Sequence, residues 1–240
     1  MCTVLLRFAP GTSWPVVCGA IRDEFADRPW DPPAAHWSGP WAGLLGGRDR
    51  TAGGTWLAVD PSPNRPALAA LLNGVRRPVL ETGARPTRGT LALDVLATGR
   101  VPQGDAVADY DGFHLVRATL DAVDVWSWDG QELEHRLLGP GDHIVVNLGP
   151  DAVDDPLVPH FAPLLAATPP PTGDSWAPWT DLLQGDGLQP GDARALLVRR
   201  EIDGRTYAST SASLVALSPD RVRYAFNPIP TDPESWYAVA

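Results

Sequence analysis

Lysine is absent from the 240 residues, only two cysteines occur, and no apolar run approaches the roughly 18 residues of a membrane-spanning helix. The absence of lysine excludes chemistry that needs a lysine nucleophile or Schiff base. Cys2 and Cys18 are too few for a disulfide framework or a four-thiolate metal site, although one disulfide between them is left open. We therefore expect no membrane insertion and a fold that depends on an apolar core.

Basic residues are also in the minority. The chain has 29 acidic and 19 basic residues, a formal net charge of −10. This charge opposes binding to phosphate backbones and anionic lipid surfaces, so nucleic acid is not expected as a partner. Arg7 interrupts the region that would have to be the apolar part of a signal peptide, so we expect a cytoplasmic protein.

Short β-rich runs between turn residues dominate both ends of the sequence, and residues 150–200 are expected to be mainly helical. We predict strands over residues 3–8, 15–21, 55–59, 66–72, 113–119, 122–128, 132–138, 143–148, 214–217 and 222–226. The segment 66–72 could equally be a helical turn. We predict helices over 88–97, 157–167 and 176–183, with Gly99 as a stop signal after the first.

Residues 27–50 are rich in proline, tryptophan and glycine and are predicted to form a long loop. Within it, Gly46-Gly47-Arg48-Asp49, like Gly53-Gly54 further on, lacks the spacing and the lysine of a phosphate-binding loop and is expected to form a turn. Strands and helices follow one another without a βαβ rhythm. This order favours a single α+β sandwich domain over residues 1–240 rather than a doubly wound sheet.

Cys2 is the candidate nucleophile. A small residue after Met1 favours removal of the initiator, which would leave Cys2 with a free α-amino group whose pKa is about 7.7–8.0. Nucleophile and general base would then belong to one residue. The alternative is that Cys2 is a small apolar residue at the start of a strand.

Two groups of polar residues could assist this thiol. Arg22, Asp23 and Glu24 follow the second predicted strand, where alternation places Arg22 and Glu24 on one face and Asp23 on the other. Asn73 and Asn147, two of only four asparagines, each close an apolar strand and could donate to an oxyanion. The alternatives are a solvated strand end with an internal ion pair and two turn-capping amides.

Ten tryptophans are available to line a pocket, and Trp30, Trp37 and Trp56 are expected to contact a ligand. The histidines lack the spacing of a zinc site, so no metal is expected. His36, beside Trp37, is the one candidate ligand for a flat cofactor such as haem, although an exposed loop histidine is the simpler interpretation. Otherwise no cofactor is expected.

Several segments resemble the NRDE family, which is named for an Asn-Arg-Asp-Glu motif and includes the transport-and-Golgi-organisation proteins. The segments that carry this resemblance are Met1-Cys2-Thr3, Ile21-Arg22-Asp23-Glu24-Phe25, Gly46-Gly47-Arg48-Asp49, Gly53-Gly54-Thr55-Trp56-Leu57 and Leu68-Ala69-Ala70-Leu71-Leu72-Asn73. The similarity continues more weakly to the end of the chain.

The family is similar to N-terminal-nucleophile (Ntn) hydrolases of the cysteine type, which implies a four-layer αββα sandwich. The resemblance further implies Cys2 as nucleophile and base, Arg22-Asp23-Glu24 as groups that hold the amine and the substrate, and Asn73 and Asn147 around the oxyanion. The reaction would be hydrolysis of, or acyl transfer from, a small amide or thioester. The other function it implies is a carrier for haem or an acyl-CoA-like ligand, and a homodimer is left open.

The sequence departs from the family pattern at two positions. Ile21 replaces the asparagine of the motif, and an isoleucine side chain can neither donate nor accept a hydrogen bond. Thr210 stands where an arginine is expected in a late segment of the family, and Thr210 and Arg205 are the residues of this region expected to contact substrate. Arg205 could substitute for that arginine only if the strand register shifts.

Overall fold

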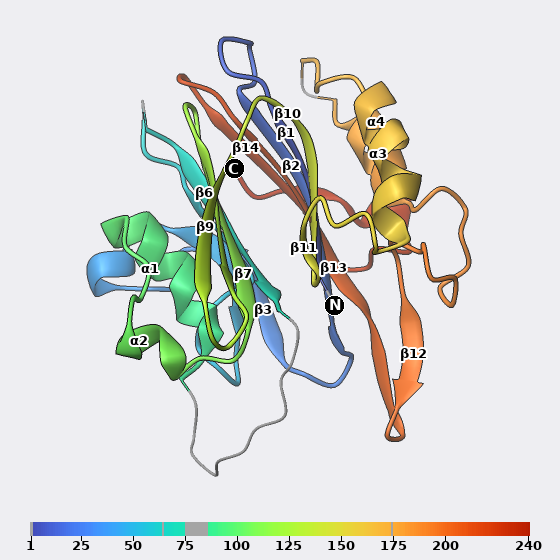
Figure 1. Ribbon diagram of the computed structural model, residues 1–240. Helices are drawn as coiled ribbons and strands as arrows, with labels where there is room; N and C mark the ends of the chain where they lie inside the picture. Colours follow the sequence, from blue (N-terminus) through green and yellow to red (C-terminus); the bar gives the residue numbers. More distant parts are fainter. Residues whose placement is uncertain (1, 64, 75–85, 174) are drawn as a thin grey trace.

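Two antiparallel sheets lie face to face in the computed structural model, which describes residues 2–63, 65–74, 86–173 and 175–240 (Figure 1). The first sheet has the order β11 (Gly149–Pro150), β10 (Gly141–Val146), β1 (Thr3–Phe8), β2 (Val16–Phe25), β13 (Arg205–Leu217), β14 (Val222–Asn227) and β15 (Tyr237–Ala238), with β12 (Arg199–Ile202) paired to β13. The second has the order β3 (Trp30–Ala34), β4 (Leu45–Asp49), β5 (Leu57–Asp60), β6 (Ala67–Asn73), β7 (Phe113–Thr119), β8 (Val123–Trp128) and β9 (Leu133–Leu138).

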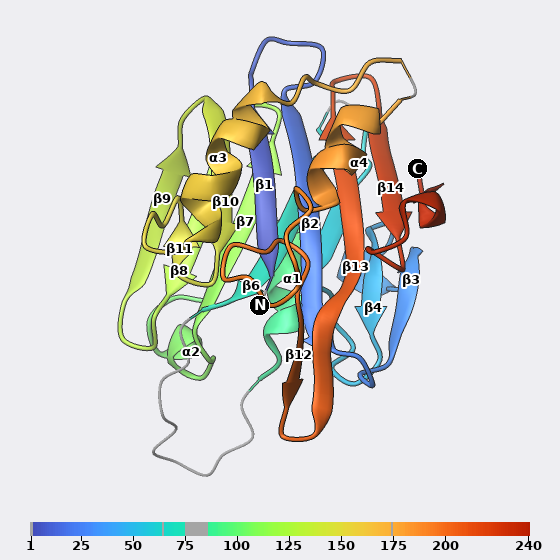
Figure 2. The ribbon, with the colours of Figure 1, turned by 90° about the vertical axis from the view of Figure 1, so that its right-hand side faces the viewer.

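Helices cover the outer face of each sheet. Those on the second sheet are α1 (Leu91–Thr98) and α2 (Asp105–Ala108). Figure 2 shows the two on the first sheet, α3 (Leu157–Ala167) and α4 (Ala177–Leu183). Short 3-10 helices span Gly39–Trp41, Arg88–Thr90 and Pro233–Ser235. The layers follow the order α, β, β, α, which confirms the predicted α+β four-layer sandwich.

Alternate residues of the facing strands form the core between the sheets. Val4 and Leu6 of β1 pack there with Leu68 of β6 and Val116 of β7, whereas Leu5 points to the opposite side, under α3 and α4. Strands β1 and β2 are therefore covered on both faces. This position requires nearly continuous apolar runs, which is why these strands were recognisable in the sequence.

Most predicted elements are confirmed. The strand predicted over 113–119 and the helix predicted over 157–167 coincide with β7 and α3, and the ambiguous segment 66–72 is strand β6. The helix predicted over 88–97 is a 3-10 turn followed by α1. Gly99 ends α1 in the left-handed conformation, with φ of 70°, as the glycine stop signal predicts.

The long loop predicted over residues 27–50 is wrong, because this segment contains β3 and β4. The prolines of β3 are tolerated since β3 is an edge strand whose pairing with β4 is irregular. The glycines of β4 form close contacts rather than a turn. A Cβ atom on Gly46 would lie 2.5 Å from the carbonyl oxygen of Leu57, and one on Gly47 would lie 2.3 Å from Cη2 of Trp56.

Strand β12 and the first half of β13 were not predicted. Residues 199–213 are rich in arginine, serine and threonine and lack an alternating apolar pattern. They pair as strands because β2 continues alongside them, and the register shifts between Ser209 and Ser211. Figure 2 shows that the hairpin of β12 and β13 extends beyond the body of the sheet.

Cys2 and Cys18 are both free thiols, so the disulfide that the sequence left open is not formed. Cys18 is fully buried between the sheets, and burial raises its pKa to about 12. In the described part of the chain, no helix has both the length and the apolar character needed to cross a membrane.

Candidate functional site

A cavity of about 270 Å³ lies where the start of β1, the end of β2, the end of β4 and the end of β6 meet. Antiparallel pairing of β1 with β2 brings Cys2 beside the charged end of β2. Its described lining residues are Cys2, Arg22, Asp23, Glu24, Arg28, Asp49, Ala52, Thr55, Trp56, Leu71, Asn73, Pro86, Thr87, Arg88, Gly89 and Asp111. The cavity thus brings together six of the predicted site residues: Cys2, Arg22, Asp23, Glu24, Trp56 and Asn73.

Cys2 is half-buried at the edge of the core between the sheets. Its backbone nitrogen donates a hydrogen bond to Oδ1 of Asn147, at 3.2 Å. Burial raises the pKa of the Cys2 thiol above its usual value, although the charge of Arg22 opposes this effect. The thiol is therefore protonated at neutral pH, so nucleophilic attack requires a base. Met1, whose removal the sequence predicts, lies outside the described residues.

Arg22 carries a buried guanidinium group, with a side chain only 4% exposed. The group lies 4.4 Å from the ring centroid of Trp56, in a cation–π contact. One nitrogen donates to Oγ1 of Thr210 at 2.9 Å, and another lies 3.7 Å from Oδ2 of Asp49. Burial lowers the pKa of Arg22, while the charges of the carboxylates near it act in the opposite direction.

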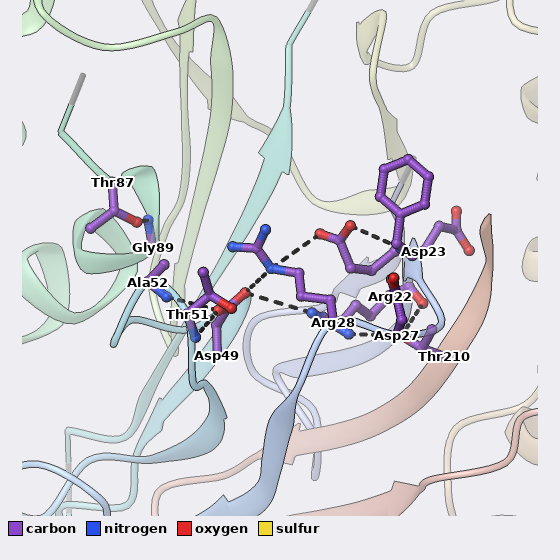
Figure 3. Close-up of polar contacts among 12 residues, drawn as sticks. Arg22, Asp23, Asp27, Arg28, Asp49, Thr51, Ala52, Thr87, Gly89 and Thr210 are labelled. Atoms are coloured by element: carbon purple, nitrogen blue, oxygen red, sulfur yellow. Dashed lines mark hydrogen bonds and ion pairs between the residues drawn. The ribbon is translucent and has the colours of Figure 1, made fainter. Parts of the chain in front are cut away.

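Asp49 is the centre of a polar network that the sequence analysis did not identify (Figure 3). Its Oδ1 accepts hydrogen bonds from the backbone nitrogens of Thr51 and Ala52, both at 2.9 Å, and its Oδ2 accepts one from Nε of Arg28 at 2.6 Å. Arg28 also lies 3.7 Å from Glu24. Burial alone would raise the pKa of Asp49, but these donors outweigh it and hold the pKa below its usual value.

The sequence around Asp49 carries a signal for this role, because it is typical of a side chain that stabilises a turn. An aspartate that precedes Thr51-Ala52 and two glycines is typical of a side chain that accepts from the backbone two and three residues later. Such a turn holds the carboxylate in a fixed position. Nothing in the local sequence indicates that two arginines from another part of the chain bind the same group.

Asp23 is buried at 4% exposure, and its side chain binds Ser209, whereas the side chain of Arg22 binds Thr210. Its Oδ1 accepts a hydrogen bond from Oγ of Ser209 at 2.6 Å, and its backbone oxygen accepts one from the hydroxyl of Tyr207 at 3.0 Å. Burial raises the pKa of Asp23 to about 7, against the effect of the Ser209 hydrogen bond. A carboxyl group with this pKa can exchange a proton near neutral pH.

The two asparagines occupy different positions. Asn147 follows β10, and it contacts Cys2 through Oδ1, while its backbone oxygen accepts from Nε2 of His114 at 3.1 Å. Asn73 is the last residue of β6, and it is exposed at the rim of the cavity. Asn147 therefore lies at the nitrogen of Cys2, whereas Asn73 faces the space that a ligand would occupy.

Four residues expected to contact substrate are not among the described lining residues. Trp30 packs edge-on against Trp56, with ring centroids 6.0 Å apart, and Nε1 of Trp37 donates to the backbone oxygen of Gly53. Oγ1 of Thr210 accepts a hydrogen bond from the guanidinium of Arg22. Arg205 binds Asp27 and lies over the ring of Phe25.

The two departures from the family pattern have structural counterparts. Ile21 is 2% exposed and packs in the apolar layer beneath α3 and α4. Thr210 sits at the register shift between Ser209 and Ser211, and this shift does not bring Arg205 to the cavity. Arg205 therefore does not substitute for the arginine of the family pattern.

His36, the candidate haem ligand, is hydrogen-bonded through Nε2 to the backbone oxygen of Pro32 at 2.7 Å and packs edge-on against Trp37. Within the described ranges, no cluster of three or more His, Cys, Asp or Glu residues could hold a metal ion. A larger cavity of about 720 Å³ is lined by residues of β7, β8, β9 and β11 and of the loops around them, His114 among them. None of the predicted site residues belongs to its described lining.

Comparison with known proteins identifies one family. Residues 1–156 match the family model described as Transport and Golgi organisation 2, which confirms the resemblance seen in the sequence motifs. No curated protein matches the chain. Among solved structures, the chain is similar to a Caenorhabditis elegans N-acylethanolamine-hydrolyzing acid amidase (NAAA) ortholog, with a TM-score of 0.48, 10% sequence identity and coverage of 100% of both chains.

Proposed function

The chain belongs to the Transport and Golgi organisation 2 family, and we propose that it is a cysteine-dependent hydrolase or acyltransferase that acts on a small amide or thioester through Cys2. The observation that carries this proposal is the hydrogen bond between the backbone nitrogen of Cys2 and Oδ1 of Asn147, next to a cavity that contains Arg22 and Asp23. If Met1 is removed, this nitrogen becomes a free amine that is already held beside the thiol.

The amine supplies the base that the thiol needs. Burial keeps the Cys2 thiol protonated, and an α-amine with a pKa of about 7.7–8.0 is partly neutral near neutral pH, so that its neutral fraction can take the thiol proton and this fraction increases as pH rises toward 8. As the proton moves to nitrogen, sulfur forms a bond to the carbonyl carbon of the substrate. Oδ1 of Asn147 then accepts a hydrogen bond from the ammonium group and stabilises it.

The carbonyl oxygen becomes negatively charged in this step and needs donors. The amide of Asn73 at the cavity rim and the guanidinium of Arg22 are the side chains proposed to stabilise it. When the intermediate collapses, the bond to the leaving amine or thiol breaks, and the leaving group takes the proton from the ammonium. A thioester on Cys2 remains. Water or another acceptor then attacks the thioester, releases the acyl group and returns a proton to the thiolate.

The lining of the cavity limits the substrate class. Charged and hydrogen-bonding side chains dominate it, and its volume of about 270 Å³ suits a small molecule. We therefore propose a short, polar acyl group rather than a long alkyl chain.

Intact-mass measurement after reaction with p-nitrophenyl acetate, an activated acyl donor, tests the proposal. The purified wild-type protein should lack Met1 and carry one acetyl group on Cys2, and C18A should behave in the same way because Cys18 is fully buried. C2A should carry none. Retention of Met1, or an acetyl adduct that persists in C2A, would overturn the proposal. Saturable quenching of tryptophan fluorescence by haemin or acyl-CoA, without an adduct on Cys2, would support a carrier instead.

A further inference from the structure

A histidine of the second sheet reaches across to the segment that holds Cys2. His114 of β7 and Ser127 of β8 are directly paired, so their side chains lie on the same face of the sheet. His114 is also paired with Leu72, which packs in the core between the sheets. Paired side chains share a face, so His114 lies on the face of the second sheet that packs against the first sheet.

Both ring nitrogens of His114 are engaged. Nδ1 lies 2.8 Å from Oγ of Ser127, and Nε2 lies 3.1 Å from the backbone oxygen of Asn147. A carbonyl oxygen can only accept, so Nε2 must carry the proton. The Ser127 hydroxyl can then donate to Nδ1. Burial lowers the pKa of His114, which is 8% exposed, and this agrees with a neutral ring that has its proton on Nε2.

Asn147 lies in the tight turn between β10 and β11, which pair through Val146 and Gly149. Its side chain accepts from Cys2 and its backbone oxygen accepts from His114, so a single residue connects the two sheets at the nucleophile. Gly149 follows in the same turn, where a Cβ atom would lie 3.6 Å from Cε1 of His114, so the ring lies close to the turn to which it donates.

We propose that His114 is a positioning residue of the Cys2 site: oriented by Ser127, it holds the backbone of Asn147 so that Oδ1 stays at the nitrogen of Cys2. His114 does not touch the substrate in this arrangement. Its effect on catalysis rests on the proposed function, whereas its hydrogen bonds do not.

The first test is independent of activity. In a long-range ¹H–¹⁵N NMR spectrum of the ¹⁵N-histidine-labelled protein at neutral pH, His114, assigned by its loss in H114Q, should be neutral with its proton on Nε2. A ring with its proton on Nδ1 alone could not donate to Asn147 and would overturn the proposal.

The second test measures Cys2 itself. H114A should slow acetylation of Cys2 by p-nitrophenyl acetate roughly tenfold to a hundredfold without a comparable change in KM, because the misplaced amine is a poorer base. It should also change the pH dependence of the reaction of Cys2 with iodoacetamide. H114Q should restore most of the rate, since a glutamine amide can donate to the Asn147 oxygen. H143A is the matched control and should react like wild type, because His143 binds Asp151 and Gly139 instead.

S127A provides the second variant if H114A fails to fold, because it deletes only one hydroxyl group. It should lower the acetylation rate, because Nδ1 of His114 loses its hydrogen-bond partner and Ser127 no longer orients the ring. Wild-type reactivity of Cys2 in H114A, or in S127A if H114A does not fold, would overturn the proposal. If the wild-type protein is not acetylated at all, the proposed function fails, and the NMR and iodoacetamide measurements still decide the role of His114.

Discussion

Thr210 and Arg22 bind each other through two hydrogen bonds, one from the guanidinium to Oγ1 at 2.9 Å and one from Oγ1 to the backbone oxygen of Arg22 at 3.2 Å. The first satisfies a donor on a side chain that is only 4% exposed. The residue that replaces the arginine of the family pattern therefore stabilises the other arginine of the site.

Replacing Thr210 with valine tests this relationship, because the two side chains have nearly the same shape. T210V should destabilise the protein by about 1–3 kcal/mol, since a buried charged donor loses its acceptor. Urea unfolding gives the difference. T206V is the matched control on the same strand: the Thr206 hydroxyl binds Glu201 at an exposed position, and its loss should change stability by less than about 0.5 kcal/mol. Equal effects of the two variants would contradict the assignment.

Asp49 should be the most sensitive carboxylate of the network. D49N keeps an oxygen for the backbone donors of Thr51 and Ala52 but removes the charge opposite Arg28 and Arg22. Because the Arg22 charge is then buried without its partner, we expect a loss on the order of 3 kcal/mol in urea unfolding. D31N, which disrupts the more exposed pair of Asp31 with Arg48, should lose less than about 1 kcal/mol. A loss in D49N no greater than in D31N would refute this interpretation of the network.

Gly47 allows Trp56 to reach Arg22. A Cβ atom on Gly47 would lie 2.3 Å from Cη2 of Trp56, so in G47A the indole must move away from its contact with the guanidinium. We expect a loss of about 1–3 kcal/mol and a changed near-ultraviolet circular dichroism spectrum. G139A is the control, since no atom lies within 4 Å of the Cβ atom it would add. An unchanged spectrum in G47A would show that Trp56 is not held in this position.

The raised pKa of Asp23 predicts a specific pH dependence of stability. Between the ordinary pKa of about 3.9 and the folded value of about 7, the unfolded chain releases a proton that the folded protein keeps. The Asp23 carboxyl therefore makes the wild-type protein less stable as pH rises through this range, by up to about 1.4 kcal/mol per pH unit.

Asparagine at position 23 does not titrate, so the free energy of unfolding of D23N should increase relative to wild type as pH rises from 4 to 7. Above pH 7 the difference between the two proteins should be constant. Urea unfolding of both proteins at several pH values measures this difference. D27N is the control and should differ from wild type by an amount that does not change between pH 4 and pH 7, because Arg205 lowers the pKa of the exposed Asp27 and its titration lies below this range. A D23N difference that does not change with pH would show that Asp23 is ionised in the folded protein throughout.

Part of the site followed from local sequence patterns. The predicted hairpin of residues 3–8 and 15–21 places the start of one strand beside the end of the next, and the observed pairing of Thr3 with Ile21 confirms it. Cys2 therefore lies next to the Arg22-Asp23-Glu24 block because of strand geometry alone. Asp49 and the contact of Asn147 with Cys2 did not follow, since these residues approach through pairings across long stretches of chain that no local period reports.

Local properties of the chain predicted short antiparallel strands, a helical block over residues 150–200, the absence of lysine chemistry and Cys2 as the candidate thiol, because periodicity, composition and side-chain chemistry depend on neighbouring residues alone. The four-layer arrangement was implied by the family resemblance. Which polar groups lie near that thiol depends on how the two sheets pack. Packing brings Asp49 to within ion-pair distance of Arg22, and it brings Asn147 into hydrogen bonds with the Cys2 nitrogen and with His114. Arg205 and Trp37 instead bind Asp27 and the backbone of Gly53. The physical reason is that buried charges and donors must find partners wherever the packed sheets bring them, and that requirement depends on the fold as a whole.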